Sequence, residues 1–140
     1  MNSMTDSVFI DTNVLVYAFL DNDKARHDMA VQLLSEMMGK EVFISTQVMS
    51  EIYSALSKNG IGHEAISNYL FDLEEDFNVR AVTPDTIRDC LLLKKKYFYS
   101  YWDSLILASS LESGCSVVYS EDMQHRQVIE QSLTIMNPFF

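Results

Sequence analysis

The feature that most constrains the fold is an alternation, along the chain, of short β-branched apolar runs and longer stretches in which apolar residues recur at helical spacing. The short runs predict strands at residues 8–10, 41–45, 78–82, 116–119 and 133–136. The stretches between them predict helices at 13–20, 24–38, 46–58, 63–76, 84–96 and 103–113. No hairpin turn signal joins any two of these strands. We therefore expect an α/β fold with a five-stranded, mostly parallel sheet, right-handed crossovers and helices on both faces.

Size and composition fit one globular domain. The chain has 140 residues, and we expect 1–140 to form a single domain with its own core. Its hydrophobic fraction is 48% and no apolar run approaches membrane-spanning length. The segment 1–6 lacks the basic and apolar parts of an export signal. Cys90 and Cys115 are therefore expected to be buried free thiols of a protein in the reducing cytoplasm.

The formal net charge of −10 restricts the possible partners. Phosphate contacts normally come from Lys and Arg, so an acidic chain is an unusual nucleic-acid binder. One interpretation is an acidic, solvated surface that says little about function. The other is that some acidic side chains converge and need cations. The same charge would favour a basic partner protein.

Four carboxylates are placed as a site would need them. Asp11 and Asp122 follow the first and fourth predicted strands, and Glu51 and Asp103 lie near the starts of helices. In a parallel sheet these positions can open onto one edge. Each alone has a plain structural explanation, as a helix cap or a solvated side chain. Together they would repel one another and raise their pKa values, which a divalent cation would relieve.

The ligand chemistry of these four side chains indicates the ion and the reaction. Carboxylates without His or Cys favour Mg²⁺ or Mn²⁺ over Zn²⁺. Such ions polarise a phosphate, activate water and stabilise a leaving oxygen, which suits phosphodiester hydrolysis. The four glycines form no phosphate-binding loop, so metal ions would replace backbone amides in holding phosphate.

The ordered set of motifs resembles the PIN-domain ribonucleases, most closely the VapC-type toxins of bacterial toxin–antitoxin pairs. The segments that carry the resemblance are 9–15, 50–51, 100–106, 120–124 and 137–139. They span nearly the whole chain in the family's order. The resemblance implies a three-layer α/β/α fold, metal-dependent cleavage of single-stranded RNA, a homodimer, and a cognate antitoxin whose tail lies across the site.

The resemblance also implies roles for individual residues. Asp11, Glu51, Asp103 and Asp122 match the family's acidic quartet, as catalytic residues and metal ligands. Asp11 and Asp103 are the first choices as direct ligands, Glu51 binds metal or orients the attacking water, and Asp122 binds a second metal or acts through water. Polar positions that support the metal site are matched by Asn13 and Ser120. The chain departs from the family at Arg126, where similar chains often carry glycine, so the loop after Asp122 is not defined by the resemblance.

Three further features have both a functional and a structural explanation. The stretch 94–102 interleaves lysines with aromatic rings before Asp103, which suits phosphate binding and base stacking but also a helix end and core packing. Lys58 follows Glu51 by two helical turns and either touches substrate or is solvated. His125 lies near the acidic turn and either reaches a phosphate or is an exposed loop residue.

Two other functions remain open from the residues. The first is an aspartate-dependent phosphatase with Asp11 as the nucleophile, although Asn13 stands where such enzymes usually have a second Asp. The second is a non-catalytic module of the same fold that binds nucleic acid or protein. The presence of all four acids argues against this module. The three histidines form no arrangement that would activate a Ser or Cys nucleophile.

Overall fold

The computed structural model describes residues 6–140, and the segment 1–5, which held most of the residues tested above for an export signal, lies outside the described part. The strands are β1 (Ser7–Ile10), β2 (Glu41–Ser45), β3 (Asn78–Arg80), β4 (Val117–Tyr119), β5 (Val128–Ile129) and β6 (Leu133–Met136). The helices are α1 (Thr12–Phe19), α2 (Lys24–Glu36), α3 (Thr46–Lys58), α4 (His63–Asp76), α5 (Pro84–Tyr97) and α6 (Tyr101–Glu112). All eleven predicted elements are present, with boundaries that shift by at most two residues.

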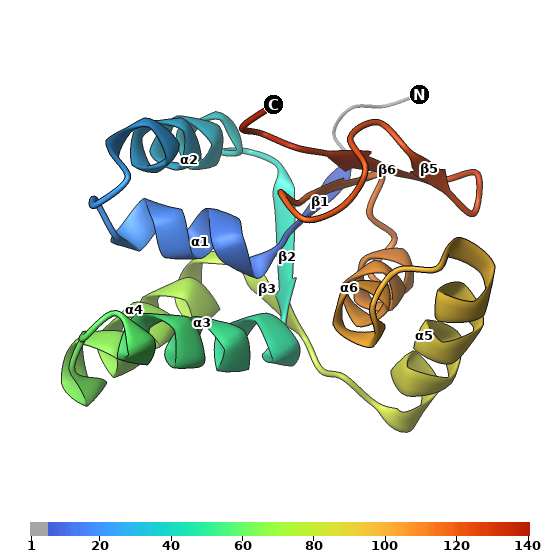
Figure 1. The fold of residues 1–140 in the computed structure, drawn as a ribbon, viewed down its shortest axis with the longest axis horizontal. Coiled ribbons are helices and arrows are strands. Elements are labelled where there is room, and N and C mark those ends of the chain that lie inside the picture. The colour runs from blue at the N-terminus through green and yellow to red at the C-terminus, as the bar shows by residue number, and fades with distance from the viewer. Residues whose placement is uncertain (1–5) are drawn as a thin grey trace.

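The strands form one sheet in the order β3-β2-β1-β4-β6-β5. β1 pairs in parallel with β2 on one side and with β4 on the other, and β6 continues the parallel part beyond β4. Two crossovers lead outward from β1 to β2 to β3, and the next returns to β4 on the other side of β1. Right-handed crossovers then place α1 to α4 on one face and α5 and α6 on the opposite face. Figure 1 shows this three-layer arrangement, with the sheet between the two groups of helices.

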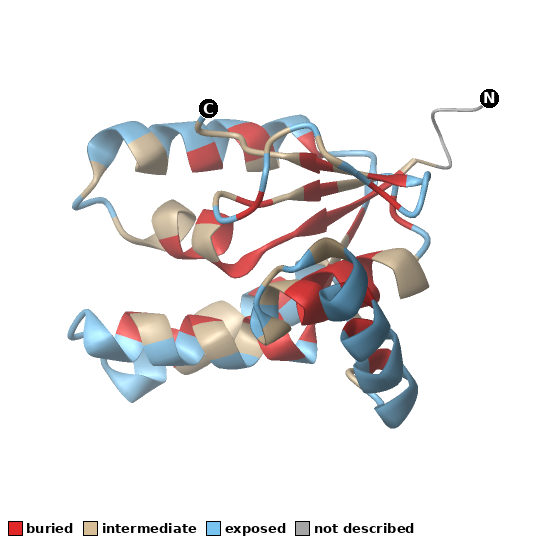
Figure 2. Cartoon of the chain, turned by 45° about the vertical axis from the view of Figure 1, so that its right-hand side comes forward, coloured by how far each residue is buried: buried red, intermediate tan, exposed pale blue. Residues whose placement is uncertain are grey.

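The core lies on both faces of the central strands. β1 is buried along its whole length, and its Phe9 and Ile10 are fully inaccessible. Figure 2 shows the buried residues gathered on the strands and on the inner sides of the helices, while the outer sides are exposed. Cys90 and Cys115 are both buried and free, as predicted. Within residues 6–140 no helix combines the length and the apolar character needed to cross a bilayer.

Local sequence signals explain most helix boundaries. Asp11 caps α1 and Asp23 caps α2, each through its side chain. Thr83 caps α5 with Pro84 in the first turn, as the sequence predicted. Asp103 was considered a possible cap of α6, but Ser100 takes that place, and Asp103 lies in the first turn with its backbone N–H donating to the Ser100 hydroxyl. Asp122, considered as a cap too, precedes no helix.

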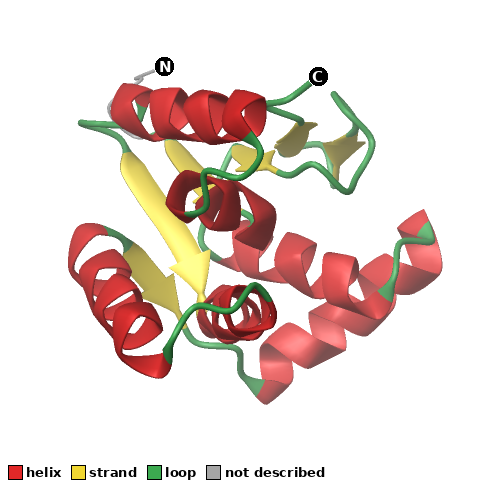
Figure 3. Ribbon diagram, turned by 60° about the vertical axis from the view of Figure 1, so that its left-hand side comes forward, coloured by secondary structure: helices red, strands yellow, loops and turns green. Residues whose placement is uncertain are grey.

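The sheet has six strands and not five, because β5 pairs antiparallel to β6 in a hairpin near the C-terminus (Figure 3). The prediction of no hairpin was therefore wrong. The turn places Glu130 and Gln131 at φ 50° and 63°, with the Ser132 N–H donating to the Ile129 carbonyl at 3.1 Å. Two successive left-handed residues usually require Asn-Gly or similar pairs, and Glu-Gln gives no such signal.

Contacts from α5 hold this turn. The Tyr97 hydroxyl accepts the Glu130 N–H at 2.9 Å and donates to a carboxylate oxygen of the same residue at 2.8 Å. Lys96 contacts that oxygen at 2.6 Å. The partners of the turn thus lie more than thirty residues away in the sequence.

Candidate active site

Asp11 directly follows β1, the central strand, and so lies at the edge of the sheet where the carboxyl ends of the parallel strands meet. Its neighbours β2 and β4 are reached by crossovers on opposite faces, and at such a switch point an open α/β sheet leaves a crevice. The Asp11 side chain is only 5% exposed. Its Oδ1 accepts the Thr12 N–H at 2.7 Å, and its Oδ2 accepts the Ser120 hydroxyl at 2.8 Å. These contacts fix the carboxylate at the start of α1.

Asp103 and Asp122 approach Asp11 from different segments. Asp103 comes from the first turn of α6, and Asp122 from the turn after β4. One carboxylate oxygen from each of the three lies within 4.8 Å of the other two. Asn13 Nδ2 donates to Asp122 Oδ2 at 3.0 Å, and the Ser120 hydroxyl accepts the Asp122 N–H at 3.2 Å. Asn13 and Ser120 therefore contact these carboxylates directly.

The environment disfavours three negative charges in this space. Burial, with the charges of Asp122 and Asp103, raises the pKa of Asp11 to about 7 against the hydrogen bonds from Ser120 and Thr12. Burial, with the charges of Asp122 and Glu51, raises the pKa of Asp103 to about 6. Burial and the charges of Glu121 and Glu51 also raise the pKa of Asp122. A divalent cation among the three carboxylates would offset both the desolvation and the repulsion.

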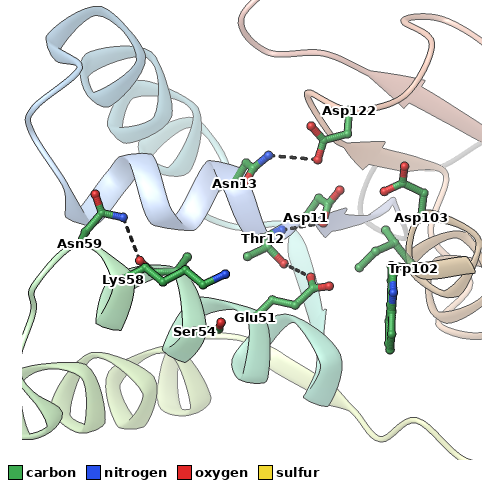
Figure 4. Close-up of a pocket in the computed structure, with 12 residues that line it drawn as sticks. Asp11, Thr12, Asn13, Glu51, Ser54, Lys58, Asn59, Trp102, Asp103 and Asp122 are labelled. Carbon is green, nitrogen blue, oxygen red and sulfur yellow. Dashed lines mark hydrogen bonds between the residues drawn. The ribbon is translucent and has the colours of Figure 1, made fainter. Parts of the chain in front are cut away.

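Glu51 lines the same pocket but lies outside the group of three carboxylates. Its Oε1 accepts the Thr12 hydroxyl at 2.6 Å, and its Oε2 accepts Gln47 Nε2 at 3.1 Å. Gln47 Nε2 also donates to the Trp102 carbonyl at 3.1 Å. Glu51 is thus held by α1 and by its own helix α3, facing the three aspartates across the pocket (Figure 4).

The pocket has a volume of about 410 Å³. Its lining residues are Asp11, Thr12, Asn13, Glu51, Ser54, Ala55, Lys58, Asn59, Trp102, Asp103, Ile106 and Asp122. Lys58 is the one basic residue among them, and in Figure 4 its side chain extends from α3 into the pocket. Lys58 is an exposed, solvated residue that also lines the pocket, so its contact with a substrate stays a prediction.

The other sequence candidates take structural roles, with one exception. Tyr97, Tyr99 and Tyr101 pack against the core, as the structural explanation of the aromatic stretch predicted. Phe98, the C-cap of α5, is 85% exposed and does not line the pocket, whereas Trp102, the exception, is 60% exposed at the pocket edge. His125 is half-buried, stacks on Phe140 at 4.2 Å between ring centroids, and accepts the Asn137 N–H through Nδ1.

Two contacts of the site were missed from the sequence. Thr12 was considered only as part of a motif and a capping turn, yet its hydroxyl holds Glu51. Gln47 lies one helical turn before Glu51, and a polar residue at this spacing beside the apolar face of α3 was a usable signal. No local signal pointed to Arg26, which contacts Glu121 from the start of α2.

Solved structures with this fold include toxins of toxin–antitoxin pairs. VapC20 from Mycobacterium tuberculosis, described as a sarcin–ricin loop cleaving toxin, is 25% identical, with a TM-score of 0.69 over 82% of this chain and 89% of that chain. A toxin–antitoxin complex from Klebsiella pneumoniae is 19% identical, with a TM-score of 0.71 over 94% and 97% of the two chains. VapBC2 from Rickettsia felis, solved with a DNA fragment of its promoter, is 15% identical, with a TM-score of 0.66 over 94% and 99%. The last two likenesses concern the fold alone.

Sequence comparison gives the family directly. None of the curated proteins matches the chain. The pattern of the family described as PIN domain matches residues 8–130, which include Asp11, Glu51, Asp103 and Asp122. The match covers most of the chain and agrees with the α/β/α fold and with the place of the acidic pocket. This chain therefore belongs to the PIN domain family.

Proposed function

We propose that this chain is a metal-dependent endoribonuclease that hydrolyses phosphodiester bonds in single-stranded RNA, as the toxin of a toxin–antitoxin pair. The observation that carries the proposal is the convergence of Asp11, Asp103 and Asp122 from three distant segments onto one pocket. Membership of the PIN domain family and the likeness to a toxin described as cleaving the sarcin–ricin loop support it.

The donor set fits Mg²⁺ or Mn²⁺. It consists of carboxylate oxygens without His or Cys. The raised pKa values of Asp11 and Asp103 mean that their negative charges are unfavourable here, and a bound cation would stabilise them. Asp11, Asp103 and Asp122 would hold the ion, with Glu51 holding a second ion or orienting water. When bound, the ion supplies Lewis-acid polarisation of the phosphate and a water of lowered pKa.

The chain's own residues position the reacting groups. Ser120 and Thr12 fix Asp11, and Asn13 fixes Asp122, so these carboxylates need little rearrangement when they bind. Each oxygen of Glu51 accepts one hydrogen bond and keeps a further lone pair for a water.

The cation of Lys58 gives the acidic pocket a place for phosphate. It is the one basic side chain among the lining residues, and it extends into the pocket from the side opposite the aspartates (Figure 4). A phosphodiester between Lys58 and the aspartates would meet positive charge on both sides once a divalent ion is bound. This arrangement answers the difficulty that the chain's net charge of −10 poses for RNA binding.

The proposed partners follow from the relatives. The Klebsiella and Rickettsia structures are complexes of toxins with antitoxins, which supports the proposal of a cognate antitoxin for this chain. The homodimer of the toxin is proposed from the family resemblance alone. A basic antitoxin tail would complement the acidic pocket. A small reading frame with a DNA-binding front half next to this gene would support the pairing.

The two alternatives fit less well. A phosphatase nucleophile has to reach the phosphorus atom, but Asp11 is almost wholly buried, and Asn13 stands where such enzymes usually have a second Asp. A non-catalytic module would have no use for three carboxylates gathered in one pocket against their mutual repulsion. Calorimetric titration with Mg²⁺ or Mn²⁺ separates the cases, because such a module would take up no divalent ion at the pocket.

The deciding experiment is RNA cleavage by purified protein, with and without Mg²⁺ or Mn²⁺. We expect metal-dependent cleavage that Asp11→Asn lowers at least about 100-fold, because this substitution removes a charged ligand and a fixed charge of the site. Asp72→Asn on the exposed side of α4 is the matched control and should cleave like the unchanged chain. Equal cleavage by the Asp11 variant and the unchanged protein would remove the catalytic claim.

A further inference from the structure

We propose that a second pocket beside the acidic one binds an unpaired nucleobase of the RNA, on the nucleotide next to the scissile phosphate. The inference rests on the proposed function and deepens it by naming what holds the substrate. The pocket has a volume of about 300 Å³ and is lined by Thr46, Gln47, Ser50, Glu51, Val82, Trp102 and Leu105.

The two pockets share a wall. Glu51 and Trp102 line both of them, so a strand whose phosphate lies among the aspartates passes directly beside the second pocket. The start of α3 forms one side of this pocket, and the start of α6 forms the other. In Figure 4 the Trp102 side chain stands at the edge of the acidic pocket, away from Asp122 and Asn13.

The lining of the second pocket suits a base better than a phosphate. None of its lining residues is basic, and its one charged residue is Glu51, whose charge would repel a phosphate. Val82, Leu105 and the Trp102 ring provide apolar surface. The Ser50 side chain is exposed and has no hydrogen-bond partner among the described residues, so its hydroxyl is available to a ligand.

The Trp102 ring is suited to stack on a base, because it is largely exposed and the neighbouring Tyr101 ring contacts it. Trp102 is 60% exposed, whereas Tyr97, Tyr99 and Tyr101 of the same stretch pack against the core, and Phe98, at 85% exposed, lies outside the pocket lining. The Tyr101 ring meets it edge-on, with centroids 4.9 Å apart and planes at 89°. An exposed indole beside a polar site is costly to solvate and is well suited to stack on a base.

Gln47 supplies a second, independent indication of a ligand. It is a buried residue of this wall, and its Nε2 donates to Glu51 Oε2 and to the Trp102 carbonyl. Both partners are acceptors, so the amide cannot be flipped, and its Oε1 is left buried without a partner in the described part of the chain. A buried acceptor without a donor is unfavourable.

The Watson–Crick edge of every base carries an N–H group that would satisfy this oxygen once a shift of the Gln47 side chain on binding exposes it to the pocket, and this edge is free only when the base is unpaired. Stacking on Trp102 and hydrogen bonding to Gln47 therefore both require a single strand. The second pocket would in this way account for the selection of single-stranded RNA by the neighbouring site.

Intrinsic fluorescence tests the inference directly, because Trp102 is the only tryptophan of the chain. A short single-stranded RNA of mixed sequence is titrated into the Asp11→Asn protein with Mg²⁺, and binding is followed in parallel by the anisotropy of a labelled copy. We expect the tryptophan emission to be quenched in step with binding. The same strand in a duplex, or with abasic sites throughout, should bind without this quenching.

Substitutions give the second part of the test. In the Asp11→Asn background, Trp102→Ala should weaken binding of the single strand about 10-fold or more and Trp102→Phe much less, since only the former removes stacking. Phe71→Ala, at another exposed aromatic residue on α4, is the matched control and should leave binding unchanged. Thermal unfolding of each variant establishes that the fold is retained.

The outcomes separate the second pocket from the proposed function. RNA binding without quenching, or binding that Trp102→Ala leaves unchanged, would overturn the inference even if the unchanged chain cleaves RNA. Quenching by single strands together with no cleavage by the unchanged chain would support the base pocket and overturn the nuclease. If neither binding nor cleavage is found, both proposals fail.

Discussion

The Thr12 hydroxyl donates a 2.6 Å hydrogen bond to Glu51 Oε1 and so joins the first turn of α1 to α3 across the acidic pocket. Thr12 is buried, and its backbone N–H holds Asp11 at the same time. One residue therefore orients two of the four acidic side chains that the sequence singled out, although they are forty residues apart in the chain. The geometry of Glu51 depends on this contact and on Gln47.

We expect Thr12→Val to lower the rate of RNA cleavage at saturating substrate roughly 10-fold, because Glu51 loses a hydrogen bond to its charged carboxylate. Thr12→Ser keeps the hydroxyl and should retain most of the rate. Because Glu51 would be mispositioned and not removed, KM should change little in either variant. Cleavage by Thr12→Val at the full rate would show that Glu51 needs no support from α1.

Asp11 should make the metal-free protein less stable as pH rises. Burial raises the pKa of Asp11 from 3.8 to about 7, so the folded state holds a proton that the unfolded chain releases. The free energy of unfolding therefore falls between about pH 4 and pH 7, with an Asp11 contribution of up to roughly 4 kcal/mol. Asp11→Asn removes this term, and its advantage in unfolding temperature over the unchanged chain should grow from pH 5 to pH 8 in EDTA. An advantage that does not change with pH would contradict the assigned cause.

Divalent metal should reverse that loss of stability. A ligand that binds only the folded state adds about 2.7 kcal/mol at one hundred times its dissociation constant. Mg²⁺ or Mn²⁺ should therefore raise the unfolding temperature of the unchanged chain at pH 8. It should have much less effect on Asp103→Asn, which lacks one of the three converging carboxylates. Equal shifts in the two proteins, measured by calorimetry, would place the metal elsewhere.

Much of the fold and site could be predicted because the signals are local. The predicted strands and helices follow from apolar spacing, and the Thr83-Pro84 start and the Asp23 cap follow from side-chain chemistry. Asp11 and Asp122 converge because they follow parallel strands whose carboxyl ends lie at one edge of the sheet, and Asp103 joins them from the start of the helix before β4.

The hairpin of β5 and β6 could not be predicted in the same way. Its turn uses Glu130 and Gln131 in a conformation that their own chemistry does not favour. Partners on α5, Lys96 and Tyr97, contact Glu130 and stabilise the turn after the chain has folded. The contact of Thr12 with Glu51 is equally non-local, and so it was not visible in the sequence either.

Arg126 has a backbone conformation that is costly for a residue other than glycine. The residue has φ 73°, in the left-handed region, and its N–H donates to the Ile135 carbonyl at 2.6 Å. Glycine adopts this backbone without strain. The loop after Asp122 therefore keeps a glycine-like conformation although it carries arginine.

We expect Arg126→Gly to unfold at a higher temperature than Arg126→Ala, by a free-energy difference of about 1 kcal/mol. Both substitutions remove the arginine side chain, so their comparison isolates the backbone term. Chemical denaturation with the same m-value for the two variants is the measurement. If the alanine variant proves as stable as the glycine variant, the left-handed conformation at this position carries no strain.

Arg26 and Glu121 form an ion pair that anchors the turn before Asp122. Arg26 Nε donates to Glu121 Oε2 at 2.6 Å, and the Tyr17 hydroxyl donates to Oε1 at 2.9 Å. The Arg26 guanidinium also lies 5.7 Å from the centroid of the Tyr17 ring and 5.8 Å from that of Phe139. The Glu121 side chain is 18% exposed, so its charge depends on these partners more than a surface carboxylate would.

Removing both partners should therefore destabilise the fold by less than the sum of the two single removals. Arg26→Met leaves the Glu121 charge without its cation, whereas the double variant with Glu121→Gln leaves no charge to compensate. We expect the loss in unfolding temperature of the double variant to fall short of the sum of the single losses by a few degrees. The exposed pair of Lys24 and Asp28, at 3.3 Å, is the matched control and should show additive changes. Additive losses at Arg26 and Glu121 as well would mean that this pair contributes no more than the surface pair does, and that the turn is held by its other contacts, from Tyr17, Ser120 and Asn13.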